Sequence, residues 1–370
     1  MKIGYEAKRV FHNKTGLGNY SRDIIRGLSI YFLENTYFLY NPKKANQTLF
    51  KANQINVFEQ FPKSNFSKKL KNYWRQKGIT KDLIQDNVTL FHGLSGELPI
   101  GLKKNNIKSV VTIHDLIFMR YPNLYSFFDR KIHYIKFKKA ARNADRIIAI
   151  SEQTKKDIIT FLKVDPSKID VIYQGCQDVF KQQYSETDKQ KIREKYNLPT
   201  EFILNVGTIE ERKNALLIVK AIRNYNTKLV LVGKKTDYYK EIENYITLHK
   251  IQDKVILLVG LTSTELAILY QLSTVFVYPS IFEGFGIPII EALYSKTPVI
   301  TNKYGVFPEA GGPNSLYIDP SDPEELQQKI DLLLNDSNLR NEMITNGFEF
   351  VQRFNDEVIA KNIMQCYYSI

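Results

Sequence analysis

Residues 280–292 read Ser280-Ile281-Phe282-Glu283-Gly284-Phe285-Gly286-Ile287-Pro288-Ile289-Ile290-Glu291-Ala292 and directly follow the apolar run Val275–Tyr278. Two glycines separated by one residue predict a loop whose backbone N–H groups can approach a ligand closely. Pro288 suits the first turn of a helix, and a helix start is a ready anion-binding site. The stretch therefore predicts a strand, a ligand-binding loop and a helix, the repeating unit of an open parallel α/β sheet.

Two carboxylates of this stretch, Glu283 in the loop and Glu291 in the helix, lie near the predicted carboxyl end of the strand. Ligands of open α/β sheets bind at that edge. A carboxylate there can accept paired hydrogen bonds from vicinal hydroxyls, such as those of a ribose or a hexose. The structural alternative is a glycine-rich turn with two solvated glutamates, and the stretch alone leaves both open.

A second loop, Asn205–Asn214, follows the apolar run Phe202–Val206 and begins with Gly207. Its adjacent Arg212 and Lys213 can hold a diphosphate, the arginine by its planar fork and the lysine as a point charge. A diphosphate gains negative charge when it leaves a glycosyl donor, and nearby cations stabilise that charge. A solvated basic pair at a helix start is the structural alternative.

Short apolar runs separated by helix-length spacers occur along the whole chain. This alternation predicts two doubly wound parallel sheets, hence an α/β protein with two Rossmann-like domains facing a central cleft. We place the first domain at residues 1–178 and the second at 179–352, and expect the terminal helix at about 353–370 to pack back on the first. The runs expected as strands are Val88–Phe91, Ser109–Ile113, Arg146–Ile150, Phe202–Val206, Leu229–Val232, Val255–Leu258, Val275–Tyr278 and Pro298–Thr301.

Two motifs of the first half are weaker signals. Gly16-Leu17-Gly18 resembles part of a dinucleotide fingerprint, but Ser21 replaces the third glycine. We interpret it as a loop of close backbone approach that opens a helix at Tyr20–Leu28. His114 ends a buried strand and is therefore expected to point into the cleft, although a structural role is the alternative. Ser151 suits the N-cap of the next helix.

Composition bounds the class of protein. Residues 1–170 carry 31 Lys and Arg against 14 Asp and Glu, whereas the remainder carries 21 against 25. This asymmetry predicts an anionic partner for the first half. No apolar run reaches membrane-spanning length, no secretory signal is apparent, and Cys176 and Cys366 show no disulfide or metal-ligand spacing. These features predict a cytoplasmic protein.

The most basic segment, residues 61–77, interleaves six basic residues with four aromatic ones. It is typical of an amphipathic helix that lies on an anionic membrane. The expected membrane or acceptor contacts are Lys68, Lys69, Lys71, Trp74 and Arg75. A solvated helix with its aromatic residues in the core is the alternative, and no nucleic-acid-binding motif supports a nucleic-acid partner.

Taken together, these stretches resemble the retaining glycosyltransferases of group 1, which have the GT-B fold, over essentially the whole chain. The most specific feature is the pair of glutamates eight residues apart with Gly-Phe-Gly between them. At residues 171–176 the chain departs from the usual family pattern, which puts the interdomain hinge in doubt. The residues that carry the resemblance are Gly16-Leu17-Gly18, His114-Asp115-Leu116, Ala149-Ile150-Ser151, Gly207-Thr208, Arg212-Lys213-Asn214, Glu283-Gly284-Phe285-Gly286, Glu291-Ala292 and Pro308-Glu309.

The resemblance implies a role for each matching residue. Glu291 would hold the donor ribose, Arg212 and Lys213 the diphosphate, and Glu283 with the backbone of Gly284, Phe285 and Gly286 the hydroxyls of the transferred sugar. His114 would lie beside that sugar, while Gly16 and Gly18 would close over the phosphates, with Gly207 also on the donor side. Catalysis would then fall to His114 and Glu283, without a metal or other cofactor.

The resulting prediction is a retaining hexosyltransferase of a surface-polysaccharide or lipopolysaccharide pathway, peripheral on the inner face of the cytoplasmic membrane. The first expectation for its donor is GDP-mannose, and for its acceptor a hydroxyl of a glycan or lipid-linked glycan. A UDP-hexose or UDP-N-acetylhexosamine transferase is the nearest alternative. A nucleotide-sugar epimerase and a non-catalytic basic protein that binds membrane or nucleic acid stay open as further alternatives.

Overall fold

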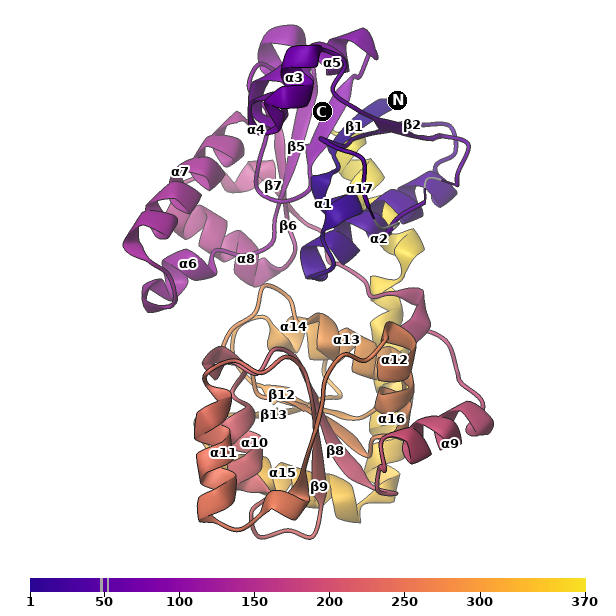
Figure 1. The fold of residues 1–370 in the computed structure, drawn as a ribbon, viewed down its shortest axis with the longest axis vertical. Helices are drawn as coiled ribbons and strands as arrows, with labels where there is room; N and C mark the ends of the chain where they lie inside the picture. The colour runs from indigo at the N-terminus through magenta and orange to yellow at the C-terminus, as the bar shows by residue number, and fades with distance from the viewer. Residues whose placement is uncertain (47–48, 52) are drawn as a thin grey trace. The chain divides into compact units, whose positions relative to one another are not determined.

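A computed structural model describes residues 1–46, 49–51 and 53–370. It divides the chain into an N-terminal unit, Met1–Gly175 with Phe354–Ile370, and a C-terminal unit, Cys176–Arg353. The division after Gly175 falls slightly before the predicted boundary at 178. Phe180 belongs to the C-terminal unit in both divisions, and it is buried edge-on against Tyr270. Figure 1 shows the two units with their helices and strands labelled.

The N-terminal unit contains a seven-stranded parallel sheet of order β3-β2-β1-β4-β5-β6-β7. Its strands are β1 (Lys2–Glu6), β2 (Thr36–Tyr40), β3 (Val57–Gln60), β4 (Leu90–Gly93), β5 (Lys108–Ile113), β6 (Arg146–Ala149) and β7 (Ile169–Val171). Its α-helices are α1 (Lys8–His12), α2 (Gly16–Tyr31), α3 (Asn65–Lys69), α4 (Lys71–Tyr73), α5 (Ile79–Gln85), α6 (Ile117–Arg120), α7 (Phe127–Asn143), α8 (Glu152–Asp157) and α17 (Asp356–Tyr368).

The C-terminal unit contains a six-stranded parallel sheet of order β10-β9-β8-β11-β12-β13. Its strands are β8 (Phe202–Val206), β9 (Lys228–Val232), β10 (Val255–Leu258), β11 (Val275–Tyr278), β12 (Val299–Asn302) and β13 (Leu316–Ile318). Its α-helices are α9 (Glu186–Lys195), α10 (Ala215–Ala221), α11 (Tyr239–Leu248), α12 (Ser263–Leu272), α13 (Ile287–Tyr294), α14 (Phe307–Gly311), α15 (Pro323–Asn335) and α16 (Ser337–Val351).

Both sheets have the strand order of dinucleotide-binding folds, so the prediction of two Rossmann-like domains is confirmed. Every expected strand is present, with ends shifted by up to two residues. The helix predicted at Tyr20–Leu28 is present within α2, but the loop expected before it was wrong, because α2 already begins at Gly16. Ser151 caps α8 as predicted, since its side chain accepts a hydrogen bond from the backbone N–H of Thr154.

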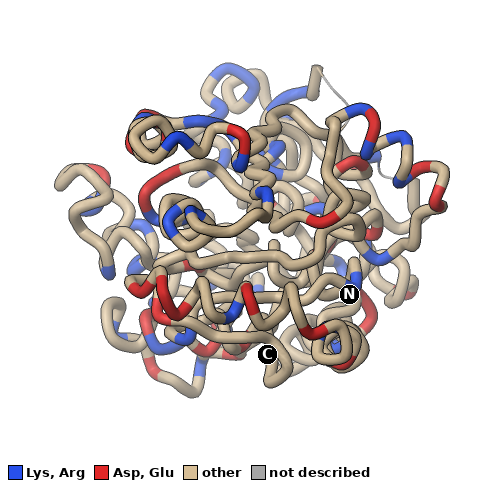
Figure 2. The backbone as a smooth tube through the Cα atoms, turned by 90° about the horizontal axis from the view of Figure 1, so that it is seen from below, with Lys and Arg blue, Asp and Glu red and all other residues tan. Residues whose placement is uncertain are grey.

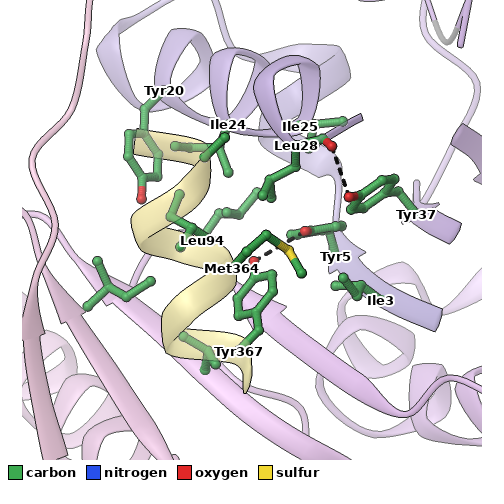
Figure 3. Close-up of a cluster of buried hydrophobic side chains, with 14 of the residues drawn as sticks. Ile3, Tyr5, Tyr20, Ile24, Ile25, Leu28, Tyr37, Leu94, Met364 and Tyr367 are labelled. Carbon is green, nitrogen blue, oxygen red and sulfur yellow. Dashed lines mark hydrogen bonds between the residues drawn. The ribbon is translucent and has the colours of Figure 1, made fainter. Parts of the chain in front are cut away.

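The C-terminal helix α17 packs against α2 and the strands of the N-terminal sheet. Figure 3 shows Met364 and Tyr367 of α17 among apolar side chains of α2 and β1. The hydroxyl groups of Tyr367 and Tyr5 lie 3.2 Å apart within this cluster. The last residues of the chain therefore complete the core of the unit that its first residues begin.

No helix among residues 1–46, 49–51 and 53–370 has both the length and the apolar character that crossing a bilayer requires.

Candidate functional site

The two predicted donor loops meet at the point where the C-terminal sheet reverses its strand order. The strands β8 and β11 are neighbours there, and their following loops contain Arg212-Lys213 and Glu283. The loops are joined directly, since the backbone N–H of Ile281 donates to the carbonyl of Arg212 at 2.8 Å. Ligands of open α/β sheets bind at this kind of crevice, beyond the carboxyl ends of the strands.

Glu283 is the centre of a compact charged cluster. Its Oε1 accepts hydrogen bonds from Lys213 Nζ, from Ser280 Oγ at 2.8 Å and from Tyr278 Oη at 3.0 Å. Arg212 also contacts this oxygen, at 2.9 Å. The structure therefore brings together the predicted diphosphate-binding cations and the predicted sugar-binding carboxylate, which lie about seventy residues apart in the chain.

The electrostatics of this cluster keep Glu283 ionised. Burial by itself raises the pKa of the carboxyl group, but Lys213 and Arg212 outweigh burial and hold the pKa below its usual value. Two cations share this carboxylate, and Arg212 also pairs with Glu210 at 2.6 Å, so the four side chains together have no net charge. Two cationic side chains are thus held in fixed positions by carboxylates, and preorganised charges of this kind can stabilise negative charge that develops in a transition state.

The glycine-rich loop leads into α13, as predicted. Gly286 is the N-cap residue with φ of +105°, a conformation that glycine adopts without steric cost, and Pro288 lies in the first turn. Phe285 is buried and anchors the loop. Gly207, at the end of β8, lies close to the side chain of Lys213.

Glu291 lies one turn into α13 and accepts a hydrogen bond from Tyr270 Oη at 3.1 Å. Burial raises the pKa of Glu291 to about 7, although the Tyr270 hydrogen bond works in the opposite direction. This carboxyl group therefore changes its charge near neutral pH, whereas Glu283 does not. A ligand that donates hydrogen bonds to Glu291 would favour its ionised form.

In the N-terminal unit, His114 directly follows β5. Its Nε2–H donates to the carbonyl of Leu94 at 2.8 Å, and its ring packs edge-on against Tyr20 with centroids 4.6 Å apart. Burial lowers the pKa of His114 to about 4, so the ring is neutral at neutral pH. Because Nε2 carries the proton, Nδ1 has its lone pair available as an acceptor.

A series of buried hydrogen bonds, which the sequence analysis did not predict, begins at Tyr20, the residue against which the ring of His114 packs. Tyr20 Oη and Thr112 Oγ1 are 3.1 Å apart, and His92 Nε2 lies 2.8 Å from the same threonine oxygen. His92 Nδ1 lies 2.6 Å from Tyr367 Oη, which links this series to α17. The sequence does contain a signal for these hydrogen bonds. His92 and Thr112 stand in otherwise apolar strands, and buried polar side chains need hydrogen-bond partners.

The predicted phosphate loop of the N-terminal unit is tightly built. A Cβ atom on Gly18 would come within 2.1 Å of the backbone oxygen of Asn13, so only glycine fits there. Arg22 ties the same turn, because it donates to the carbonyls of Val10 and Asn13 at 2.9 and 2.8 Å. At Gly16, by contrast, a Cβ atom would meet open space, so sterics within the protein do not require glycine at this position.

The predicted membrane segment is only partly at the surface. Trp74 is fully buried and donates to Asp82 Oδ2 at 2.7 Å, so its assignment as a membrane contact was wrong. The side chain of Arg75 is partly exposed and pairs with Glu6 at 2.7 Å and Glu97 at 3.4 Å, so its assignment as a membrane or acceptor contact stays a prediction. The segment is not one helix, since α3 ends at Lys69 and α4 begins at Lys71. Lys68, Lys69 and Lys71 are exposed.

Two further donor-side residues, Ser280 and Tyr270, were not assigned a role from the sequence. Ser280 stands in the motif itself, three residues before Glu283, and a hydroxyl that supports a loop carboxylate is a recognisable pattern. Tyr270 belongs to α12 and donates a hydrogen bond to Glu291 of α13, and the sequence around Glu291 does not predict this contact. Such a partner is visible only once the helices are packed.

Two protein-family models match the chain, and together they cover most of both units. The model described as Glycosyltransferase Family 4 matches residues 16–178, and the one described as Glycosyl transferases group 1 matches residues 188–350. The second range contains the whole cluster around Glu283, and the first contains His114.

Individual relatives agree with these models. The chain is 32% identical over 224 residues to the O-antigen chain mannosyltransferase RfbU of Salmonella typhimurium, a match that covers 60% of the chain and 59% of RfbU. It is 30% identical over 305 residues to an uncharacterized glycosyltransferase of Methanocaldococcus jannaschii, covering 80% of the chain and 77% of that protein. Among solved structures, Anabaena HepE in complex with UDP matches with a TM-score of 0.78 at 18% identity, covering both chains entirely.

Proposed function

The chain belongs to the group 1 glycosyltransferase family, and from this premise we propose that it transfers a hexose from a nucleoside diphosphate sugar to a hydroxyl of a glycan. The observation that carries the proposal is the Arg212–Lys213–Glu283 cluster at the strand-order reversal of the C-terminal sheet. A non-catalytic basic protein would not need two cations placed to receive a leaving diphosphate. An epimerase that releases the nucleoside diphosphate could use the same cations, but it would need no acceptor.

The proposed reaction retains the anomeric configuration. The bond between the sugar C1 and the diphosphate oxygen breaks, and the acceptor oxygen bonds to C1 from the same face. The acceptor proton passes to the leaving diphosphate oxygen, so no side-chain nucleophile takes part. Lys213 and Arg212 stabilise the charge that develops on the diphosphate, and Glu283 orients the sugar hydroxyls.

His114 is proposed to contact the transferred sugar. Its ring is neutral, its protonated Nε2 is held by Leu94, and Nδ1 can accept a hydrogen bond from a sugar hydroxyl. The buried series of hydrogen bonds from Thr112 to Tyr367 fixes the position of Tyr20, against which the ring of His114 packs. His114 therefore positions the sugar rather than transferring a proton.

Mannose from GDP-mannose is the proposed donor. RfbU, with 32% identity to this chain, is named as an O-antigen chain mannosyltransferase. A UDP-hexose is the second candidate, because the HepE structure of similar fold holds UDP. The acceptor is proposed to be a glycan or lipid-linked glycan in surface-polysaccharide synthesis, with the enzyme peripheral on the inner face of the cytoplasmic membrane. The basic first half of the chain supports that location.

The direct test is an NMR assay of transfer from GDP-mannose and from UDP-glucose to glycan acceptors. We expect one donor to be consumed, with the α-linked donor giving an α-linked product. An inverted product, or interconversion of the donor sugar without an acceptor, would contradict the proposal, and the second result would favour the epimerase.

We further propose that the reaction needs no protein-held metal, because the cationic side chains of Arg212 and Lys213 lie where a metal would otherwise neutralise the diphosphate. Chelation with EDTA is therefore expected to leave the transfer rate within about twofold of the untreated enzyme, since charge stabilisation comes from the side chains. Restoration of a lost rate by added Mg²⁺ or Mn²⁺ would contradict this expectation.

A further inference from the structure

Helix α7 of the N-terminal unit has an apolar face that is largely exposed within that unit, as far as the described residues show. Phe128, Ile132 and Ile135 are 76%, 52% and 56% exposed. Residues spaced by four, three and four positions lie on one side of a helix, so these three and Lys139 form one line, which we call the outer α7 stripe. The adjacent Phe127 is 67% exposed. Contiguous exposed apolar side chains of this size mark interaction surfaces.

The opposite side of α7 is the side that packs on the protein. Ala140 and Ala141 are buried there, and Tyr134 and Phe137 pack against the same core cluster. The helix thus has one apolar face toward the core and a second toward solvent. The core face already anchors the helix, so burial in the N-terminal unit does not account for the exposed apolar side chains of the outer α7 stripe.

The charge on α7 indicates the kind of partner. The helix contains six Lys and Arg residues and one Asp. Lys131 and Lys138 flank one side of the outer α7 stripe and Lys136 flanks the other. An apolar line flanked by lysines matches a bilayer interface, where apolar side chains enter the acyl region and lysines reach the anionic head groups. Figure 2 shows Lys and Arg along the backbone in blue and acidic residues in red.

A cavity of about 380 Å³ borders this surface. Lys136, Lys139 and Ala140 of α7 line it on one side, and Ile100, Lys103 and Lys104 line it on another. Lys139 belongs to both the cavity and the outer α7 stripe. Glu97 also lines the cavity, but it pairs with Arg75 and Lys136 at 3.4 Å each. Lysines beside apolar walls suit a molecule that has an anionic head group and an apolar body.

We propose that the outer α7 stripe docks on an anionic phospholipid bilayer, with the lysines of α7 and of the adjoining cavity holding lipid phosphates. A second copy of the chain fits less well, because a symmetric contact would bring two strongly basic helices together. The proposal rests on the proposed membrane association and names the surface responsible, which differs from the segment predicted from sequence.

The test is co-sedimentation of the full chain with vesicles of phosphatidylcholine, with and without phosphatidylglycerol. Wild-type protein is expected to sediment only with phosphatidylglycerol present. Combined Phe128→Ser, Ile132→Ser and Ile135→Ser, and separately Lys131→Glu with Lys139→Glu, should each weaken binding by about tenfold or more, because they remove the apolar and the electrostatic part of the contact. The matched control is Leu248→Ser with Lys250→Glu, which alters an exposed leucine and lysine of the C-terminal unit and should bind normally.

Each remaining outcome overturns the assignment. The assignment is wrong if the wild-type protein does not bind vesicles that contain phosphatidylglycerol. It is also wrong if the α7 variants bind normally while Lys68→Glu, Lys69→Glu and Lys71→Glu together abolish binding. A wild-type dimer that the serine variant converts to a monomer, with no vesicle binding, would identify a second copy as the partner. Vesicle binding is measured without substrates, and nucleotide-induced thermal stabilisation of each variant shows independently that the donor site is intact.

Discussion

Lys213→Ala is expected to lower kcat/KM for the sugar nucleotide by about 10² to 10³-fold, the usual effect of removing one preorganised group that stabilises transition-state charge. The lysine is held in place by Glu283 and by Tyr278, whose Oη lies 2.7 Å from Nζ. It therefore needs little rearrangement to meet a leaving diphosphate. Steady-state kinetics with the donor varied at a fixed acceptor concentration measures the effect.

The matched control for this substitution is Lys195→Ala. Lys195 also forms an ion pair, with Glu265 at 2.5 Å, but the pair lies at the surface of the same unit, away from the donor loops. Loss of a solvent-exposed pair has little effect on stability, and we expect no change in kcat/KM. Equal rates for Lys213→Ala and wild-type enzyme would show that the cluster is structural.

Glu283→Gln separates the two parts of the cluster. Glutamine keeps the shape of the side chain but removes the carboxylate that Lys213 and Arg212 share, while Arg212 keeps its pair with Glu210. A free nucleoside diphosphate should therefore bind at least as tightly as it does to the wild type. Transfer should nevertheless fall, because the sugar loses the charged acceptor that orients it. Tight diphosphate binding with slow transfer is the combination that assigns the cations to the phosphates and the carboxylate to the sugar.

The second large effect concerns Glu291 and pH. Its pKa is raised by burial to about 7 in the ligand-free protein, and ribose hydroxyls donate stronger hydrogen bonds to the ionised carboxylate than to the neutral acid. The dissociation constant of the nucleotide should therefore be about tenfold larger at about pH 6 than at about pH 8. Glu291→Gln should remove the charge-assisted bonds, a loss of about 1.5–3 kcal/mol in binding, and with them this pH dependence.

The same shift has a consequence for stability. Because the folded-state pKa lies above the ordinary value of 4.5, protonated Glu291 adds stability that is fully present below pH 4.5 and is lost as the pH rises through about 7. At neutral pH, a bound nucleotide should compensate for this loss of stability by stabilising the ionised form of Glu291. Protonated Glu291 should therefore release its proton when the nucleotide binds. Calorimetric titration in two buffers of different ionisation enthalpy measures that proton.

Two variants distinguish this account from titration of the nucleotide's own phosphates. Glu291→Gln retains any contribution from the phosphates, so a pH profile identical to that of the wild type would contradict the role of Glu291. Tyr270→Phe removes the hydrogen bond that lowers the pKa of Glu291, so the midpoint of the binding profile should move to higher pH.

The sequence predicts the second sheet and its donor loops well for a physical reason. Phe202–Val206, Val255–Leu258 and Val275–Tyr278 are short, mostly apolar strands between helix-length spacers, and they are the observed β8, β10 and β11. The ends of neighbouring parallel strands share one edge, so the meeting of Lys213 with Glu283 follows once the topology is known. By contrast β3, β7 and β13 are edge strands of three or four residues and give almost no periodic signal.

Burial of individual side chains was harder to predict. Trp74 lies in a basic stretch that resembles an interfacial helix, yet it belongs to the core because Asp82, eight residues later, accepts its indole N–H. Conversely, the apolar residues of α7 alternate around the helix, so the sequence does not distinguish the side that meets the core from the outer α7 stripe. Both assignments depend on which elements pack together, and the local sequence does not contain that information.

The measurement that tests the central claim most directly is a thermal-shift screen of the purified protein with GDP, UDP, ADP and their sugar conjugates. A ligand at 100 times its dissociation constant should stabilise the folded state by about 2.7 kcal/mol. We predict a clear rise in Tm with one nucleotide, GDP first, that is lost in Lys213→Ala and reduced in Glu291→Gln. No rise with any nucleotide, or a rise that both variants keep in full, would contradict the assignment of this cluster as the donor site.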